Sequence, residues 1–197
     1  MLKNVIKEIQ QKPLGYLTII CARPGDGRRT FAIELANDFA MKGFQVCFCS
    51  VFRTKTSLKN KLLPGVRVLN IFSHNRNLIL KRLSRFSKLC DTVVLVDDLS
   101  SFMFYERLKK MSVGAYDEIK SKTEWLKKIK ETAIQQGMRV VVTDTFPRAS
   151  DTDDTSAIPC ETLELCDGAY ILYKESVIVN NLWNPYKSEL KLKEINL

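Results

Sequence analysis

The stretch that decides the fold is Tyr16–Thr30, which reads YLTIICARPGDGRRT. Residues 16–22 are almost all apolar, a pattern typical of a strand buried on both faces of a parallel sheet. The turn that follows contains Gly25 and Gly27, and apolar residues at every fourth position then predict a helix over 31–41. The free N–H groups and the dipole of a helix N-terminus favour an anion. The sequence therefore predicts a phosphate-binding loop.

Outside this stretch, short apolar runs alternate with segments whose apolar residues recur at helical spacing. The further predicted strands are Gln45–Cys49, Thr92–Val96, Arg139–Thr143 and Ala169–Tyr173, and the further predicted helices are Asn77–Leu89 and Asp117–Gln135. Two last runs, Val177–Val179 and Glu189–Leu192, predict a hairpin. Such alternation gives βαβ units, so we expect an α/β fold whose mainly parallel sheet is covered on both faces.

In sheets of this kind, ligands bind beyond the carboxyl ends of the strands. The loops that we expect to carry function are therefore 22–30, 50–55, 97–104 and 144–160.

Length and composition are those of an ordinary globular domain, with 197 residues of which 45% are apolar. The six cysteines include no C-x-x-C pair and the chain has one histidine, so neither a zinc site nor a disulfide framework is expected. No apolar run approaches the roughly 20 residues of a membrane span, and the first residues mix acids with bases. We expect a cytoplasmic protein without a membrane segment.

The net charge of +9 is unevenly distributed. No Asp or Glu lies between Phe39 and Cys90, where eleven Lys and Arg residues occur, whereas seven acids lie between 140 and 167. A basic field of this kind attracts nucleic-acid phosphates or an acidic protein. We expect such a partner along 53–88, and the opposite charges of the two segments suggest head-to-tail contacts in a homo-oligomer. The candidate contact residues on the predicted helix are Lys81, Arg82, Arg85 and Lys88.

The side chains of the predicted phosphate loop depart from those of a working P-loop. Where a lysine and a Ser or Thr are needed for the phosphates and Mg²⁺, the chain has Arg28 and Arg29, and Thr30 comes one position late. Arg29 places a cation where the metal would lie. Two cations at a helix N-terminus oppose the dipole, so we expect them to meet an anion or an acidic partner. The candidate phosphate-binding residues are Arg23, Pro24, Gly25, Asp26, Gly27, Arg28, Arg29 and Thr30.

At these residues the chain resembles the RecA-type ATPase domain of DnaB-type replicative helicases. Gly15–Ala32 is similar to the strand and A-R-P-[SG]-x-G-K-[ST]-x-F-A loop of that family. Further similar segments are Gly43–Ser50 (second strand), Val94–Asp97 (Walker B), Lys120–Arg148 (the unit that carries the sensor residues) and Cys166–Tyr173 (final strand). The resemblance implies a RecA-like three-layer P-loop fold with ATP and Mg²⁺ as ligands. Because the first strand begins by residue 16, we expect 1–197 to be one such domain, without the helicase N-terminal domain or linker helix.

Transferring the roles of the family shows which parts are altered. The family lysine falls at Arg28, its Ser or Thr at Arg29, its catalytic glutamate at Phe52 and its γ-phosphate-sensing glutamine at Thr145. Asp97 is retained as the carboxylate that would hold Mg²⁺. The adjacent Asp98 stands where some P-loop ATPases carry their catalytic carboxylate.

Three functions are compatible with these residues. The favoured one is a non-hydrolysing DnaB-like module that binds nucleotide, another anion or a partner in DNA replication or mobile-element DNA metabolism. The second is an active ATPase motor subunit with Arg28 and Asp98 in altered roles. The third is a DNA-binding accessory protein that uses the basic segment and keeps a vestigial pocket. Three acids in 150–155 would repel a phosphate backbone, which argues against a pore that translocates DNA.

Overall fold

The computed structural model describes residues 15–22, 27–51, 55–58, 60–70, 76–85, 92–112, 117–145, 160–172, 176–180 and 192–196. The strands are β1 (Leu17–Ala22), β2 (Gln45–Ser50), β3 (Arg67–Asn70), β4 (Thr92–Asp97), β5 (Arg139–Thr145), β6 (Gly168–Leu172), β7 (Ser176–Asn180) and β8 (Leu192–Asn196). The helices are α2 (Arg28–Met41), α3 (Lys55–Leu58), α4 (Arg76–Ser84), α5 (Leu99–Phe102), α6 (Phe104–Met111), α7 (Glu118–Gln136) and α8 (Cys160–Leu165).

The strands form one sheet in the order β3-β2-β4-β5-β1-β6-β7-β8. Neighbours from β3 to β6 pair in parallel, and β7 pairs antiparallel with both β6 and β8. This confirms the expected α/β fold with a mainly parallel sheet and a C-terminal hairpin. The last strand was misplaced, because β8 shares only Leu192 with the predicted run Glu189–Leu192. The observed register sets Ile195 opposite Val177, which matches apolar with apolar.

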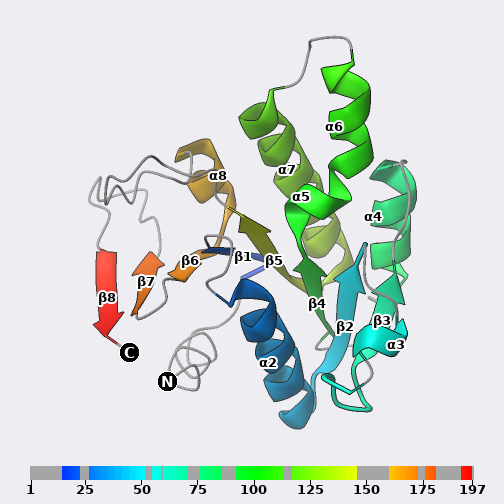
Figure 1. The fold of residues 1–197 in the computed structure, drawn as a ribbon, viewed down its shortest axis with the longest axis vertical. Helices are drawn as coiled ribbons and strands as arrows, with labels where there is room; N and C mark the ends of the chain where they lie inside the picture. Colours follow the sequence, from blue (N-terminus) through cyan, green and yellow to red (C-terminus); the bar gives the residue numbers. More distant parts are fainter. Residues whose placement is uncertain are drawn as a thin grey trace.

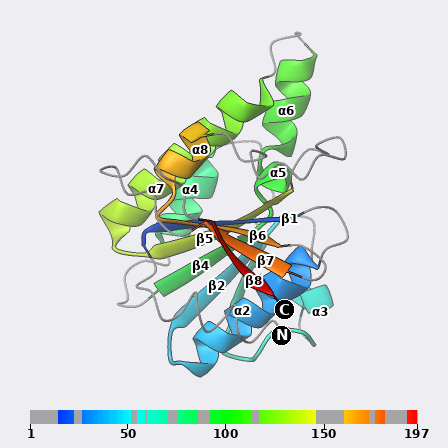
Figure 2. The ribbon, with the colours of Figure 1, turned by 90° about the vertical axis from the view of Figure 1, so that its left-hand side faces the viewer.

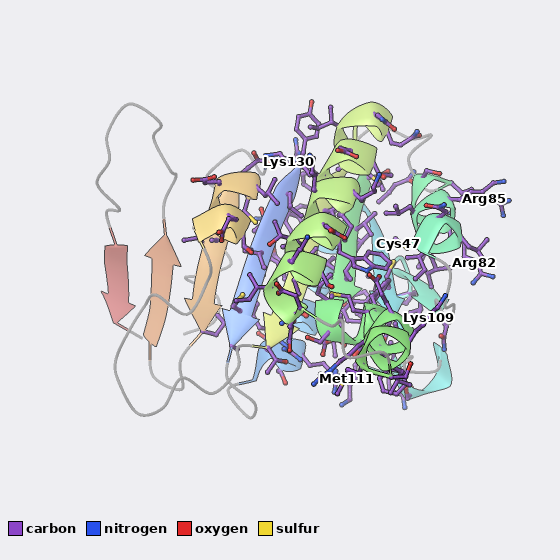
Figure 3. All side chains as sticks on the ribbon, turned by 90° about the horizontal axis from the view of Figure 1, so that it is seen from above. Cys47, Arg82, Arg85, Lys109, Met111 and Lys130 are labelled. Carbon is purple, nitrogen blue, oxygen red and sulfur yellow. The ribbon has the colours of Figure 1, made fainter. Side chains whose placement is uncertain are left out.

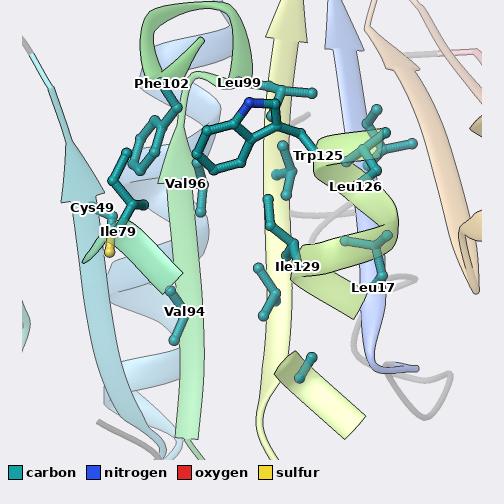
Figure 4. Packing of buried hydrophobic residues seen from close by; sticks show 14 of the residues in the cluster. Leu17, Cys49, Ile79, Val94, Val96, Leu99, Phe102, Trp125, Leu126 and Ile129 are labelled. Atoms are coloured by element: carbon teal, nitrogen blue, oxygen red, sulfur yellow. The ribbon is translucent and has the colours of Figure 1, made fainter. Parts of the chain in front are cut away.

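Helices cover both faces of the sheet, which gives three layers (Figure 1 and Figure 2). α2 and α3 lie on one face, where Phe31, Leu35 and Phe39 of α2 pack against alternate residues of the central strands. α4, α5, α7 and α8 lie on the other face. There Trp125, Leu126 and Ile129 of α7 pack against the residues of the same strands that point the opposite way (Figure 4). Both faces of the central strands are thus buried, as continuous apolar runs require.

The long helix α7 begins and ends where its sequence dictates. The Asp117 carboxylate accepts a hydrogen bond from the Lys120 N–H at 3.0 Å, which caps the N-terminus. At the other end, Gly137 adopts a left-handed backbone with φ 63° and stops the helix. The prediction of 117–135 was therefore correct to within a residue.

The structure differs from the sequence-based prediction for one helix and one loop. The helix predicted for Asn77–Leu89 is α4, Arg76–Ser84, and residues 86–90 lie outside the described residues. The segment 97–104, expected as a loop, instead carries α5 and the start of α6. In the part of the chain that the structure describes, no helix is both long and apolar enough to cross a membrane.

Candidate phosphate-loop site

The site lies where β1, β4 and β5 end. The parallel register sets Ala22 beside Thr145 and Asp97 beside Thr143, so the three carboxyl ends share one edge of the sheet. Gly27 then leads into α2 with a left-handed φ of 79°, a conformation that glycine adopts without strain. Of the candidate phosphate-binding residues, the structure describes 27–30, whereas 23–26 lie outside the described residues.

Arg29 forms an ion pair with Asp97. Its Nε donates to Asp97 Oδ2 at 2.9 Å, and the Asp97 side chain is 0% exposed whereas that of Arg29 is 41% exposed. The second carboxylate oxygen, Oδ1, accepts a longer hydrogen bond of 3.4 Å from the Thr143 hydroxyl. Both oxygens of this buried carboxylate are therefore already bonded.

Arg28 forms a second ion pair with the neighbouring carboxylate. Its Nη2 lies 2.6 Å from Asp98 Oδ2, and its Nη1 donates to the hydroxyl of Thr145. The other oxygen, Asp98 Oδ1, accepts from the Ser101 N–H at 2.7 Å and so caps α5. The peptide bond between the two aspartates is cis. The Arg28 side chain thus ties the end of β4 to the end of β5.

We call this arrangement of Arg28, Arg29, Asp97 and Asp98 the arginine–aspartate clasp. Its two guanidinium charges balance its two carboxylate charges. Hydrogen bonds between ionised groups are among the strongest in proteins, and a buried carboxylate without a cation would be costly. Arg28 and Arg29, which were expected to meet an anion at the N-terminus of α2, therefore bind carboxylates of the chain itself.

The clasp does not fit a resident Mg²⁺. The metal needs carboxylate oxygens and tolerates little departure from octahedral geometry, yet cations already bind both carboxylates. Within the described ranges, no three His, Cys, Asp or Glu side chains are grouped so as to hold a metal ion. The position where Mg²⁺ was expected is consequently filled by guanidinium groups.

A second polar network, which the sequence did not reveal, lies beside the clasp. Lys122 Nζ of α7 is 2.8 Å from Asp144 Oδ2 and 3.1 Å from Glu118 Oε1, and Ser100 Oγ donates to Asp144 Oδ1 at 2.8 Å. Burial lowers the pKa of Lys122, but the attraction and hydrogen bonds of Asp144 and Glu118 outweigh it, so the pKa lies above its ordinary value. Lys122 therefore stays charged and joins α7 to the end of β5.

The cysteines near the site are buried thiols. Burial, and to a smaller extent the Asp144 carboxylate, raises the pKa of Cys21 well above its ordinary value. Burial and the adjacent Cys47 do the same to the pKa of Cys49. Thiols held in the protonated form are poor nucleophiles and metal ligands, so these residues act as small core side chains.

The candidate partner residues lie on a different face of the molecule from α2. Lys81 and Arg82 belong to α4 and Arg85 follows it, whereas Lys88 lies outside the described residues. Figure 3 shows Arg82 and Arg85 pointing away from the sheet. The structure therefore does not bring the basic helix and the phosphate loop into one site.

A mainly parallel sheet covered by helices on both faces, with Gly27 at the start of α2 after β1 and Asp97 at the end of β4, gives the chain a RecA-like α/β fold. Comparison with solved structures supports the same class. A KaiC-like protein from the hyperthermophilic archaeon Pyrococcus horikoshii superposes with a TM-score of 0.63 and 14% identity, over 92% of this chain and 84% of its own. A DnaB-like replicative helicase, solved in a study of its interactions with primase, superposes with a TM-score of 0.68 and 13% identity, over 98% of this chain.

The chain spans 62% of the length of that helicase. It also covers 92% of a third structure, an isolated ATPase domain, with a TM-score of 0.61 and 14% identity. No protein-family model and no curated protein matches the sequence. At such low identity the likeness concerns the fold, which is that of DnaB-like and KaiC-like ATPase domains.

Proposed function

We propose that this chain is a P-loop domain that does not hydrolyse nucleotide and acts as a module for binding an anion, a nucleotide or a partner. The observation that carries the proposal is the arginine–aspartate clasp, in which Arg29 and Arg28 bind Asp97 and Asp98. On the basis of the resemblance to DnaB-type helicases, we propose that such a module serves in DNA replication or mobile-element DNA metabolism.

The clasp lacks a lysine and binds both carboxylates to guanidinium groups, which counts against phosphoryl transfer. That chemistry relies on a lysine that reaches the phosphates and a metal that neutralises developing charge. The planar guanidinium of Arg28 does not replace a compact ammonium in a tight loop. Asp98, the candidate for an alternative catalytic base, has one oxygen bound by Arg28 and the other by the N-terminus of α5. It is therefore held as a structural carboxylate, which counts against an active ATPase.

Binding of an anion without metal is compatible with this geometry. Only Nε of Arg29 bonds within the described chain, and the side chain is 41% exposed. Its terminal nitrogens are therefore open to a phosphate that approaches the N-terminus of α2, where backbone N–H groups add to the attraction. In this proposal, ATP binds weakly and without Mg²⁺.

ATP turnover tests the proposal. We expect the purified protein to release phosphate no faster than its Asp97→Ala variant, with or without Mg²⁺, because no metal-bound carboxylate takes part. A control with Lys127→Met, an exposed position on α7, corrects for contaminating ATPases that copurify with any variant. Metal-dependent turnover that Asp97→Ala abolishes and Lys127→Met leaves intact would instead establish an active enzyme.

A basic accessory protein is the second candidate, and the observation that favours it is the exposed basic face of α4. Lys81 and Arg85 are exposed, and Arg82 is partly so.

A further inference from the structure

The short helix α6 carries a stripe of exposed apolar side chains. Phe104, Leu108 and Met111 follow one another at i, i+4 and i+7, so they lie on one face of the helix. They are 40%, 51% and 54% exposed, respectively. Single exposed apolar residues are common, but a contiguous stripe is typical of a site of interaction.

The opposite face of α6 anchors the helix to the domain. Glu106 Oε2 accepts a hydrogen bond of 2.8 Å from the indole N–H of Trp125, a residue of α7 that is buried in the core. Phe102 and Met103, just before α6, are buried in the same core. Because Glu106 lies opposite the stripe on the helix, Leu108 and Met111 face away from the domain. Figure 1 shows α6 rising beyond the edge of the sheet.

The surroundings of the stripe are basic. Arg107 and Lys109 of α6 are both exposed; Arg107 borders the stripe, and Lys109 lies farther round the helix. α4, with Lys81 and Arg82, lies on the same face of the sheet, and its Ile79 belongs to the core cluster that holds Phe102 (Figure 3 and Figure 4). The exposed apolar groups of α6 and the positive groups of α6 and α4 therefore lie on the same face of the sheet. We call this region, made by α6 and the polar face of α4, the α6 surface.

We propose that the α6 surface binds an acidic amphipathic helix of a partner protein. A helix recognises such a surface with its own apolar stripe at i, i+3, i+4 and i+7, while acidic residues on its flanks meet Arg107, Lys109 and the bases of α4. A symmetric contact between the α6 surfaces of two copies fits poorly, because two α6 helices in contact would bring like charges together. A nucleic acid would use the bases but leave the stripe of Leu108 and Met111 without a role.

This surface lies apart from the arginine–aspartate clasp and uses none of its residues. The inference therefore goes beyond the proposed function, and a negative result for one of the two proposals does not affect the other. Peptide binding tests the surface, whereas turnover tests the clasp.

The experiment uses a fluorescent helical peptide of about 18 residues, with leucines at i, i+3, i+4 and i+7 and glutamates on the flanks. A matched peptide has lysines in place of the glutamates. We expect the acidic peptide to bind, as measured by fluorescence anisotropy, and the basic peptide not to bind. Leu108→Asp combined with Met111→Asp should weaken binding about tenfold or more, because both apolar contacts are lost and like charges are added.

Ile134→Asp is the matched control, since Ile134 is 50% exposed on α7 and lies outside the α6 surface. It should leave the affinity unchanged, and circular dichroism verifies that each variant is folded. Absence of binding by the acidic peptide, or equal affinity for all variants, would overturn the proposal.

A single-stranded oligonucleotide of about 20 nucleotides tests the competing occupant. Binding that falls steeply with salt and with Arg82→Glu combined with Arg85→Glu, but ignores Leu108→Asp and Met111→Asp, would assign the surface to nucleic acid. Weak or absent oligonucleotide binding beside tight binding of the acidic peptide supports the inference.

Discussion

Replacement of Lys122 by methionine should lower the free energy of unfolding by about 3–4 kcal/mol, because it leaves a buried carboxylate without its cation. The side chains of Lys122 and Asp144 are only 13% and 7% exposed, and the two atoms of the pair are 2.8 Å apart. Methionine keeps most of the apolar stem, so the loss reports the charge and its hydrogen bonds. Urea-induced unfolding, followed by tryptophan fluorescence, measures the change.

The control is Lys127→Met, which removes an exposed charge from the same helix and should cost about 0.5 kcal/mol or less. The variants also differ in their response to pH. Because the pKa of Lys122 is raised in the folded protein, its contribution is complete below the unfolded value of about 10.4. It is then lost as pH rises through the higher folded value. A Lys122→Met variant as stable as Lys127→Met at neutral pH would show that the network contributes nothing.

The second large effect is expected at the clasp. Arg29→Ala should lower the free energy of unfolding by about 2–3 kcal/mol, since Asp97 loses the one cation that binds it within the described chain. The value lies at or below the low end for buried pairs, because the Arg29 side chain is 41% exposed and solvent screens its charge. The same denaturation measurement gives this loss.

A second substitution separates charge from packing. Adding Asp97→Asn to Arg29→Ala should restore most of the stability, because a neutral amide needs no cation. Two results contradict the ion pair: Arg29→Ala without effect, or a double variant no more stable than Arg29→Ala alone. The first result would mean that water already stabilises the charge of Asp97. The second would mean that Arg29 stabilises the folded protein by packing.

Much of the fold could be predicted because its strands carry a strong local signal. The run TVVLV is apolar throughout and became β4 with one residue added, since such a run is stable only when buried on both faces. The sequence does not predict β3, because its four residues, RVLN, lie at the edge of the sheet. They are at most partly buried and therefore show no continuous apolar run. The sequence does not predict α6, because its exposed apolar residues Phe104, Leu108 and Met111 face away from the core and give no stripe of a buried helix.

The candidate site, like the fold, could be predicted from the sequence only in part. The strand, the glycine turn and the aspartates follow from local sequence, as does the expectation that Arg29 puts a cation in the place of Mg²⁺. The partners of the arginines do not, because Arg28 and Asp98 are 70 residues apart and Arg29 and Asp97 are 68 apart. Their pairing depends on the parallel register that brings β1, β4 and β5 to one edge. Lys122 lies on the same face of α7 as the buried Leu126, Ile129 and Ala133, but the sequence does not identify its partner, because Asp144 belongs to a different element, β5.

In the clasp, guanidinium groups bind the carboxylates that a metal would need. Electron paramagnetic resonance of Mn²⁺ tests it most directly, because Mn²⁺ replaces Mg²⁺ at oxygen ligands and its free signal can be counted. With ATP present, we predict that adding the wild-type protein removes no more of that signal than adding the Asp97→Asn variant. Stoichiometric loss of the Mn²⁺ signal with the wild type, absent with Asp97→Asn, would contradict the clasp.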